Sequence, residues 1–582
     1  MRKEEKNMRK ILAALLCLSM LISLVPAVMA ETPEPITLTV FRGDPGDQPT
    51  EDNKIYKLIE EKFGIKFNFT YLTGDLDQTL STRLASGTYP DLFDGGNSAD
   101  LIISGGALIN LLDYISPEKT PRLWAHIEPQ KARLIEKDAE GNDVLYIIPN
   151  YGLPDGPQIA LSVGGPAFFI QKQVLAWDDY PEIKTMDQYF DLLERFLDAN
   201  PNDENGTPYT GFAILCEDWR HFCLINPVQH LMGRPNDGEV YICVTDQNYE
   251  VTGNDPAQEF KTETFIDKEY AKPYYKKLNE AYHAGLIDRS TFTMSYDQYI
   301  AAISNGTVLG MFDQAWDFGT ATSALTDNKM YDRTYVALGL VYDPDYVNGA
   351  EIEEHYLNGS LPNVRRGFGI STSCTCPERI VAMWEEMMSD EWQMIFNWGI
   401  EGEDYYIDEN GRLNMTEEQY ANTQNSQWKL ANKADGFFQS SPKKQGWIMN
   451  DIQVGDKVVK AGNCWEPGNQ DEIVFGLMNE YDKEFLGAYG YSKFADFVNA
   501  PIELAPYGEA WQIDYTPVST AHDNFLKVQD EQLPQLIMCE PDEFDAKWDA
   551  FVNEIKPYAD EFAAFMQDAV VAEAHKVLDN AQ

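Results

Sequence analysis

The chain has 582 residues, of which 94 are Asp or Glu and 45 are Lys or Arg, so its formal net charge is −49. Binding to nucleic acid requires clusters of Lys and Arg that neutralise phosphates, and so large an excess of acid argues against it. The same charge disfavours anionic membrane surfaces and polyanionic ligands. With only 7 His residues, the composition also argues against a receptor for zinc or manganese.

Residues 1–30 have the features of a cleavable export signal. A basic segment is followed by the apolar stretch Ile11–Val25, which is too short to span a membrane. Val28 and Ala30 supply small side chains at the cleavage positions, so we expect cleavage before Glu31. Cys17 lies inside the apolar stretch, so we expect no lipid anchor. The sequence predicts an extracellular protein, or a periplasmic one if the cell has two membranes.

The segment that follows alternates between strand and helix patterns. Apolar residues at period 2 or at helical spacing predict the strands Ile36–Phe41, Ile65–Tyr71 and Tyr89–Asp94 and the helices Thr50–Phe63 and Asp75–Ser86. This succession is typical of a doubly wound sheet, in which ligands bind beyond the carboxyl ends of the strands. Arg42, Asp44 and Asp94 follow such strand ends and become candidate ligand residues. The alternative for each is a solvated turn.

A second group of elements begins with a strand at 167–171 and a helix whose first turn is capped by Thr185. A strand at 212–215 then leads into Glu217, Trp219 and Arg220. An aromatic face beside polar groups suits a sugar, because a pyranose offers an apolar C–H face for stacking and hydroxyls for hydrogen bonds. The alternative is that Trp219 belongs to a core.

A further helix, capped by Ser295, precedes the turn at Asn305 and a strand at 308–312. The strand ends in Asp313, Gln314 and Trp316. This segment resembles one in maltodextrin-binding and related receptors, where a Trp stacks on a sugar. The resemblance implies that Trp316 is a ligand platform with Asp313 and Gln314 beside it. The chain departs from that pattern at Gln314, where relatives have Gly.

The stretch Gly367–Gly411 carries a second resemblance. It contains Pro377-Glu378 at the start of one helix, Ser389-Asp390-Glu391 at the start of the next, and Gly399-Ile400-Glu401-Gly402 before Tyr405. In this order the residues resemble a signature of extracellular solute-binding proteins, the receptors of ABC-type sugar importers. The step Ser86–Asp91, with its Pro-Asp pair, also matches that family.

The resemblance implies an α/β fold with two lobes, the periplasmic-binding-protein-like fold of type II, whose lobes are interleaved and joined by hinge crossings. We therefore divide the chain into a signal peptide at 1–30, a first part of lobe 1 at 31–157 and a first part of lobe 2 at 158–364. Residues 365–415 would return to lobe 1, and residues 416–582 would complete lobe 2. The C-terminal patterns Phe544–Val552 and Pro557–His575 predict amphipathic, acidic scaffold helices.

Such a protein would capture an oligosaccharide between its lobes and deliver it to the permease subunits of an ABC transporter, as a monomer and without catalysis. The 12% aromatic content favours a sugar over a small ion. Three further residues become candidate ligand contacts: Arg365 at a hinge crossing, although a structural salt bridge is an alternative, together with Tyr405 and Trp465 in polar loops. Other readings are a receptor for a peptide or another small solute, or a secreted glycoside hydrolase or lyase.

The sequence predicts neither a cofactor nor a metal. Residues 201–206 occupy a place where some relatives have a calcium loop, but the EF-hand spacing is not met, so a plain turn is expected. Seven Cys follow the signal segment, without a CxxC motif or a neighbouring His that would indicate zinc. Because seven is odd, at least one thiol is free or pairs between molecules.

Overall fold

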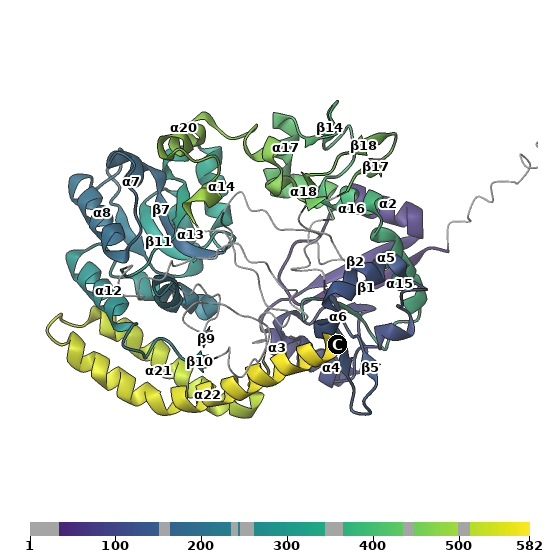
Figure 1. Cartoon of the computed structure of the whole chain (residues 1–582), viewed down its shortest axis with the longest axis horizontal. Helices are drawn as coiled ribbons and strands as arrows, with labels where there is room; N and C mark the ends of the chain where they lie inside the picture. Colours follow the sequence, from purple (N-terminus) through teal and green to yellow (C-terminus); the bar gives the residue numbers. More distant parts are fainter. Residues whose placement is uncertain are drawn as a thin grey trace, which may run out of the picture.

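The computed structural model describes residues 34–149, 163, 165–233, 242–244, 261–343, 365–434, 447–448, 450–498 and 513–581. The signal segment predicted at 1–30 lies outside these residues. The chain forms two α/β bodies side by side, lobe 1 at the right and lobe 2 at the left of Figure 1. Among the described residues, no helix has the length and apolar character needed to cross a membrane.

Lobe 1 is built on a five-stranded sheet of order β2-β1-β3-β13-β6. β1 lies parallel to both β2 and β3, whereas β13 runs antiparallel to β3 and β6. The elements of this lobe alternate along the chain much as predicted: β1 (Ile36–Arg42), α2 (Lys54–Phe63), β2 (Ile65–Tyr71), α3 (Leu76–Ser86), β3 (Leu92–Phe93), β6 (Ile148–Pro149), β13 (Gly367–Ile370), α15 (Pro377–Met387) and α16 (Asp390–Asn397).

Capping explains where the first helices of lobe 1 begin and end. The Asn53 side chain accepts hydrogen bonds from the backbone N–H groups of Ile55 and Tyr56, and Gly64 ends α2 in the left-handed conformation. Asp75 caps α3, which ends at Gly87. Buried apolar faces of these helices and of α15 cover the sheet, so the core of lobe 1 lies between helices and strands.

Lobe 2 contains a four-stranded sheet of order β12-β7-β11-β8. β11 is antiparallel to β7 and parallel to β8, and all its side chains are buried. Capping boxes at Thr185 and Ser295 start two of the helices, as the sequence predicts. The main elements are β7 (Pro166–Gln171), α7 (Lys172–Trp177), α8 (Met186–Ala199), β8 (Thr210–Ala213), α9 (Phe222–Ile225), α12 (Lys272–Ala284), α13 (Tyr296–Ser304), β11 (Val308–Gln314), α14 (Gly319–Asp327) and β12 (Tyr335–Leu338).

The chain passes between the lobes more than once, which confirms the interleaved fold. It leaves lobe 1 after β6 and enters lobe 2 at β7, and it returns from β12 to β13. A third crossing lies between α19 (Asp471–Val474), which packs with the lobe 1 side, and α20 (Glu480–Tyr489), which packs in the core of lobe 2.

The described residues between 416 and 477 lie against lobe 1, so the return to lobe 2 comes after Leu477, later than the predicted boundary at 416. The part of the chain that follows α16 comprises β14 (Tyr406–Ile407), β15 (Leu413–Asn414), α17 (Glu417–Gln424), α18 (Ser426–Asn432), β16 (Trp447–Ile448), β17 (Ile452–Val454), β18 (Lys457–Val459) and β19 (Asn463–Cys464). Its apolar side chains pack on Met394 and Trp398 of α16 and the loop that follows. The Leu430 carbonyl accepts hydrogen bonds from Thr50 and Asn53 of lobe 1. Figure 1 shows α17, α18 and β17 above lobe 1.

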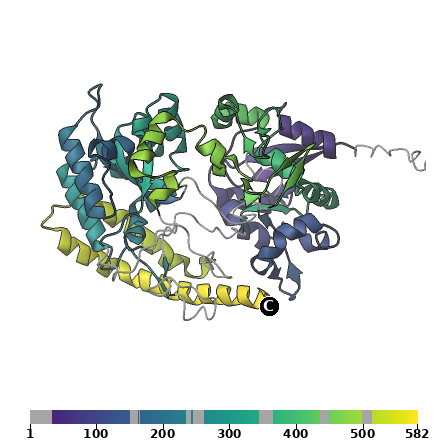
Figure 2. The same ribbon diagram turned by 45° about the horizontal axis from the view of Figure 1, so that its top comes forward.

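The two amphipathic patterns predicted at the C-terminus form a single helix. α22 runs without interruption over Phe544–Ala581, with Pro557 inside it. Together with α21 (Ser519–Met538) it lies along lobe 2, and its C-terminal end extends toward lobe 1 (Figures 1 and 2).

Candidate functional site

Three aromatic rings lie at the end of β11. Phe222 is buried, and Trp219 stacks with it at a centroid separation of 5.8 Å and an interplanar angle of 19°. Trp316 stacks with Trp219 at 5.7 Å and 14°. Trp316 is 57% exposed and Trp219 44%, although both carry large apolar surfaces. We name Trp219 and Trp316 the aromatic platform. It is anchored in the core of lobe 2 by Phe222 and leaves Trp316 with the most accessible ring.

Neighbouring side chains hold the platform in place. The Trp316 Nε1–H donates to Gln314 Oε1 at 2.6 Å. The Arg220 guanidinium lies 4.4 Å from the centroid of Trp219 and 3.9 Å from that of Tyr296, and its Nε donates to Asp317 at 3.2 Å. Arg220 is thus fixed by two rings and a carboxylate. In this position the guanidinium packs against the platform.

A buried carboxyl group, that of Asp313 in β11, lies three residues before Trp316. Asp313 is fully buried, and it accepts hydrogen bonds from the Tyr299 hydroxyl at 2.7 Å and from the Gln314 backbone N–H at 2.7 Å. Burial, together with the neighbouring charge of Asp317, raises the pKa of Asp313 to about 7. Burial also raises the pKa of Asp317, an effect opposed by Arg220. Asp313 therefore contributes to the turn that carries Trp316 and does not face solvent.

Glu217, like Asp313, accepts a hydrogen bond that holds the local backbone. Its Oε2 accepts a hydrogen bond from the backbone N–H of Tyr296 at 2.6 Å, at the start of α13. Tyr296 in turn donates its hydroxyl to the Asp317 carbonyl at 2.6 Å. The structure thus brings together all six residues that the sequence placed on this side, namely Glu217, Trp219, Arg220, Asp313, Gln314 and Trp316. Tyr296, which the sequence did not indicate, connects these residues to α13 through its contacts with Glu217, Arg220 and Asp317.

A charged cluster lies at the strand ends of lobe 1. Asp44 accepts from the guanidinium groups of Arg42, at 3.2 Å, and of Arg366. Asp94 is buried beside Arg42 at 3.4 Å and accepts from the Gly96 backbone N–H at 2.8 Å. Burial raises the pKa of Asp94, and the positive charges of Arg42 and Arg366 oppose that rise. The structure thus brings together the three predicted residues Arg42, Asp44 and Asp94, and Arg366 joins the same cluster.

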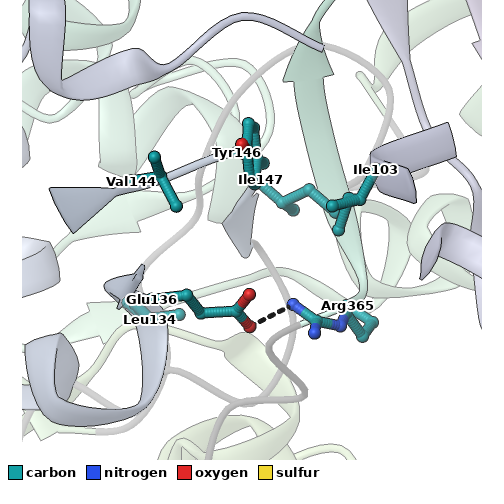
Figure 3. A pocket seen from close by; sticks show the side chains of 7 residues that line it. All are labelled: Ile103, Leu134, Glu136, Val144, Tyr146, Ile147 and Arg365. Carbon is teal, nitrogen blue, oxygen red and sulfur yellow. Dashed lines mark ion pairs between the residues drawn. The ribbon is translucent and has the colours of Figure 1, made fainter. Parts of the chain in front are cut away.

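Arg365 forms ion pairs with residues outside this cluster. Its Nε donates to Asp100 at 2.9 Å and its guanidinium pairs with Glu136 at 2.7 Å. Figure 3 shows this pair beside a small hollow lined by Ile103, Leu134, Val144, Tyr146 and Ile147. The hollow has room for about one water molecule, which is far too little for a sugar ring. The structural salt bridge, left open by the sequence, is the arrangement observed.

Two predicted ligand residues are buried in the segment that packs on lobe 1. Trp465 is 2% exposed and Tyr405 1% exposed, and both belong to the apolar cluster formed with Trp398, Leu413 and Ile452. The Trp398 and Tyr405 rings contact each other at 5.6 Å. The prediction that Trp465 is exposed in a polar loop is wrong, because the short β15–β19 strands fold over it. Neither residue can stack on a ligand in this conformation.

The loop at 201–206 is a hydrogen-bonded turn. Asp203 accepts from the backbone N–H groups of Asn205 and Thr207, at 2.9 and 2.7 Å. The Arg333 guanidinium pairs with Asp203 at 3.7 Å and also with Glu204. A fixed positive charge therefore faces the two carboxylates. In the part of the chain that the structure describes, no group of three or more His, Cys, Asp or Glu side chains is arranged to hold a metal ion.

Comparison with known proteins gives a consistent answer for the fold. No family profile and no curated sequence matches this chain. Among solved structures, the Streptococcus pneumoniae ABC-transporter substrate-binding protein FusA, in complex with fructo-nystose, superposes with a TM-score of 0.58 at 16% identity over 92% of this chain and 99% of that one. The alginate-binding protein AlgQ2 gives 0.55 at 16% identity, with coverage of 93% and 98%.

An HMO-binding, ABC-transporter-associated solute-binding protein from Bifidobacterium longum infantis gives a TM-score of 0.57 at 15% identity, covering 92% of this chain and 99% of that one. At such low identity the likeness establishes architecture. The chain thus has the two-lobed α/β fold of solute-binding proteins, as the sequence predicts, and it spans nearly the full length of these neighbours.

Proposed function

We propose that this chain is an exported receptor that captures an oligosaccharide between its two lobes and delivers it, without chemical change, to an ABC-type importer. The observation that carries the proposal is the aromatic platform at the carboxyl end of β11, in a chain with the solute-binding-protein fold. Exposed, pre-stacked Trp rings held by polar neighbours are costly to leave in water unless a ligand covers them. A pyranose ring offers the apolar face that fits such a surface.

The ligands of the structural neighbours favour the same ligand class. FusA is described in complex with fructo-nystose, AlgQ2 as alginate-binding, and the Bifidobacterium protein as binding HMO. These descriptions belong to those proteins. They support the proposal because the platform is on lobe 2 of the shared fold and would meet a sugar in the space where such receptors take their ligands.

We assign the second wall to lobe 1, where Asp44 and Arg366 are the accessible members of the charged cluster and the buried Arg42 and Asp94 hold them in place. Its residues lie at the carboxyl ends of β1 and β3 and at the start of β13, the edge of an α/β sheet where ligands bind. Sugar hydroxyls are well suited to planar carboxylate and guanidinium partners. A ligand that touches both walls would favour the closed arrangement of the lobes, by a hinge motion at the crossings.

The arrangement of carboxylates disfavours the hydrolase alternative. A glycosidase needs two carboxyl groups on either side of the scissile bond, both able to reach it. Near the platform, Asp313 is fully buried, Asp317 is bound to Arg220, and Glu217 accepts the N–H that starts α13. These three groups build the turn and are not free to transfer protons to a glycosidic oxygen.

A thermal-shift screen of the chain from residue 31 onward tests the proposal, with defined oligosaccharides, peptides, amino acids and divalent metals as probes. A ligand at a hundred times its Kd stabilises the folded state by about 2.7 kcal/mol, which is readily detected. We expect stabilisation by one class of glycan, recovered unchanged by mass spectrometry. Stabilisation by a peptide or metal and by no glycan would overturn the ligand class. Cleavage of the glycan would overturn the absence of catalysis.

A further inference from the structure

The C-terminal helix α22 is long enough to contact both lobes. Its 38 residues correspond to about 57 Å, whereas a helix of about 20 residues already spans a small domain. Figures 1 and 2 show the same course from two directions: α22 runs along lobe 2 beside α21, and its last turns reach the side of lobe 1 near α6 (Lys131–Leu134). One helix therefore contacts both halves of the molecule.

The first part of α22 is fixed to lobe 2. Trp548, Ile555 and Phe562 are buried in the lobe 2 core, and α22 packs along α21. The strand β10 (Lys261–Glu263) also binds this helix. Its Thr262 backbone N–H donates to Gln567 Oε1 at 2.7 Å, and the Thr262 hydroxyl donates to the Ala563 carbonyl at 3.2 Å. As far as Gln567, α22 moves with lobe 2.

The last turns keep a buried face beyond that point. Val570, Ala574 and Val577 recur at helical spacing and are at most 6% exposed. α22 contacts α6 of lobe 1, and Ala132 of α6 packs against the same apolar cluster. Leu134, two residues on, is buried in the core of lobe 1. The short helix α6 thus has one side chain in each core.

The same part of lobe 1 is joined to a hinge crossing. Glu136 follows α6 directly and pairs with Arg365 at 2.7 Å, and Arg365 lies just before β13, where the chain re-enters lobe 1 (Figure 3). Arg365 also donates to Asp100 in α4 (Ala99–Ser104) at 2.9 Å. A shift of α6 would therefore be transmitted through Glu136 and Arg365 to the crossing between β12 and β13.

We propose that the last turns of α22, which contact α6 and share one apolar cluster with Ala132 through Val570, Ala574 and Val577, form an interlobe contact that sets the angle between the lobes. Two lobes joined by flexible crossings can rotate, and any contact made in only one arrangement shifts the population toward it by the free energy of that contact. The interlobe contact uses none of the residues of the platform or of the charged cluster in lobe 1. The contact acts on the angle between the lobes whatever ligand the protein binds, so this inference does not depend on the proposed function.

The test is a distance measurement between the lobes by double electron–electron resonance on the full mature chain. Labels are introduced by a genetically encoded amino acid at Lys57 of α2 and Glu194 of α8, two exposed positions, because the chain has free thiols of its own. Ala574→Glu places a carboxylate in the interlobe contact. Ala572→Glu is the matched control, since Ala572 is exposed on the same helix and receives the same charge.

We expect the Ala574→Glu distribution to be broader than wild type and shifted in its mean, and the Ala572→Glu distribution to match wild type. Ala132→Glu, which alters the lobe 1 side of the contact, should reproduce the effect of Ala574→Glu. If circular dichroism shows that Ala574→Glu does not fold, the distance distribution of Ala132→Glu tests the proposal in its place. Wild-type distributions in folded Ala574→Glu and Ala132→Glu would overturn the proposal. No glycan is added, so this outcome is separate from that of the glycan screen.

Discussion

Removing the outer ring of the aromatic platform should weaken ligand binding while leaving the fold intact. Trp316 is 57% exposed, its ring lies parallel to Trp219, and its indole N–H is held by Gln314. Trp316→Ala removes the accessible ring face and keeps the backbone turn, because the Asp313 contacts do not involve the Trp316 side chain. The substitution therefore acts on the surface that a sugar would cover.

The magnitude follows from the exposed area. A Trp side chain carries up to about 250 Å², so the 57% that is exposed corresponds to about 140 Å². A pyranose on one face would cover about half of this, and about 70 Å² at ~25 cal/mol per Å² gives about 1.8 kcal/mol. With the spread usual for aromatic contacts, we expect a loss of about 1–2 kcal/mol, which is a rise in Kd of roughly 5- to 30-fold.

Isothermal titration with the glycan found in the screen measures this change. Trp177→Ala is the control, because Trp177 lies on the same lobe and is 43% exposed, but its ring packs on Phe196, away from the platform. Both variants should unfold at nearly the wild-type denaturant midpoint, as is usual for exposed side chains. An unchanged Kd for Trp316→Ala, or an equal rise for Trp177→Ala, would refute the assignment of the platform.

Three other predictions concern buried groups. Trp465→Ala should lower the free energy of unfolding by about 3–5 kcal/mol, the usual cost of emptying a core Trp site, which denaturant titration measures. The pKa of Asp313 in the folded state is raised to about 7, so the stabilisation from its protonated form is complete below the pKa of the unfolded state and is lost as pH rises through 7. The free energy of unfolding of wild type relative to Asp313→Asn should therefore fall between pH 5 and pH 8. A constant difference would contradict the assignment. Arg333→Ala should lower the melting temperature by removing the cation that pairs with Asp203, whereas EDTA should not change the melting temperature of wild type; a drop with EDTA would indicate a bound metal.

Local patterns predicted the elements that build the walls of the site. The strands and helices of both lobes were recognisable because caps such as Asp75 and Ser295 and left-handed glycines such as Gly64 act within a few residues. The turn at Trp316 was found because it follows a buried strand, and the position of a strand end is a local property. The likeness to solute-binding proteins then supplied the two-lobed arrangement, which the fold comparison confirms.

Contacts between distant segments were not predictable in this way. Trp465 reads as exposed because its neighbours in sequence are polar, yet its burial depends on β15, β17 and α16, which come from elsewhere in the chain. The end of the lobe 1 segment was placed too early for the same reason, since the hydrogen bonds from Thr50 and Asn53 to Leu430 join residues far apart in sequence. At Pro557, a local signal for a break was overridden by packing on both sides of it.

Hydrogen–deuterium exchange of the mature chain, with and without the glycan, tests the central claim most directly. If a glycan is held between the lobes, backbone amides at both walls should be protected together: residues 42–44 and 94–97 of lobe 1, and residues 313–317 of lobe 2. Protection of one wall alone, or of neither while the glycan still stabilises the chain, would contradict capture between the lobes.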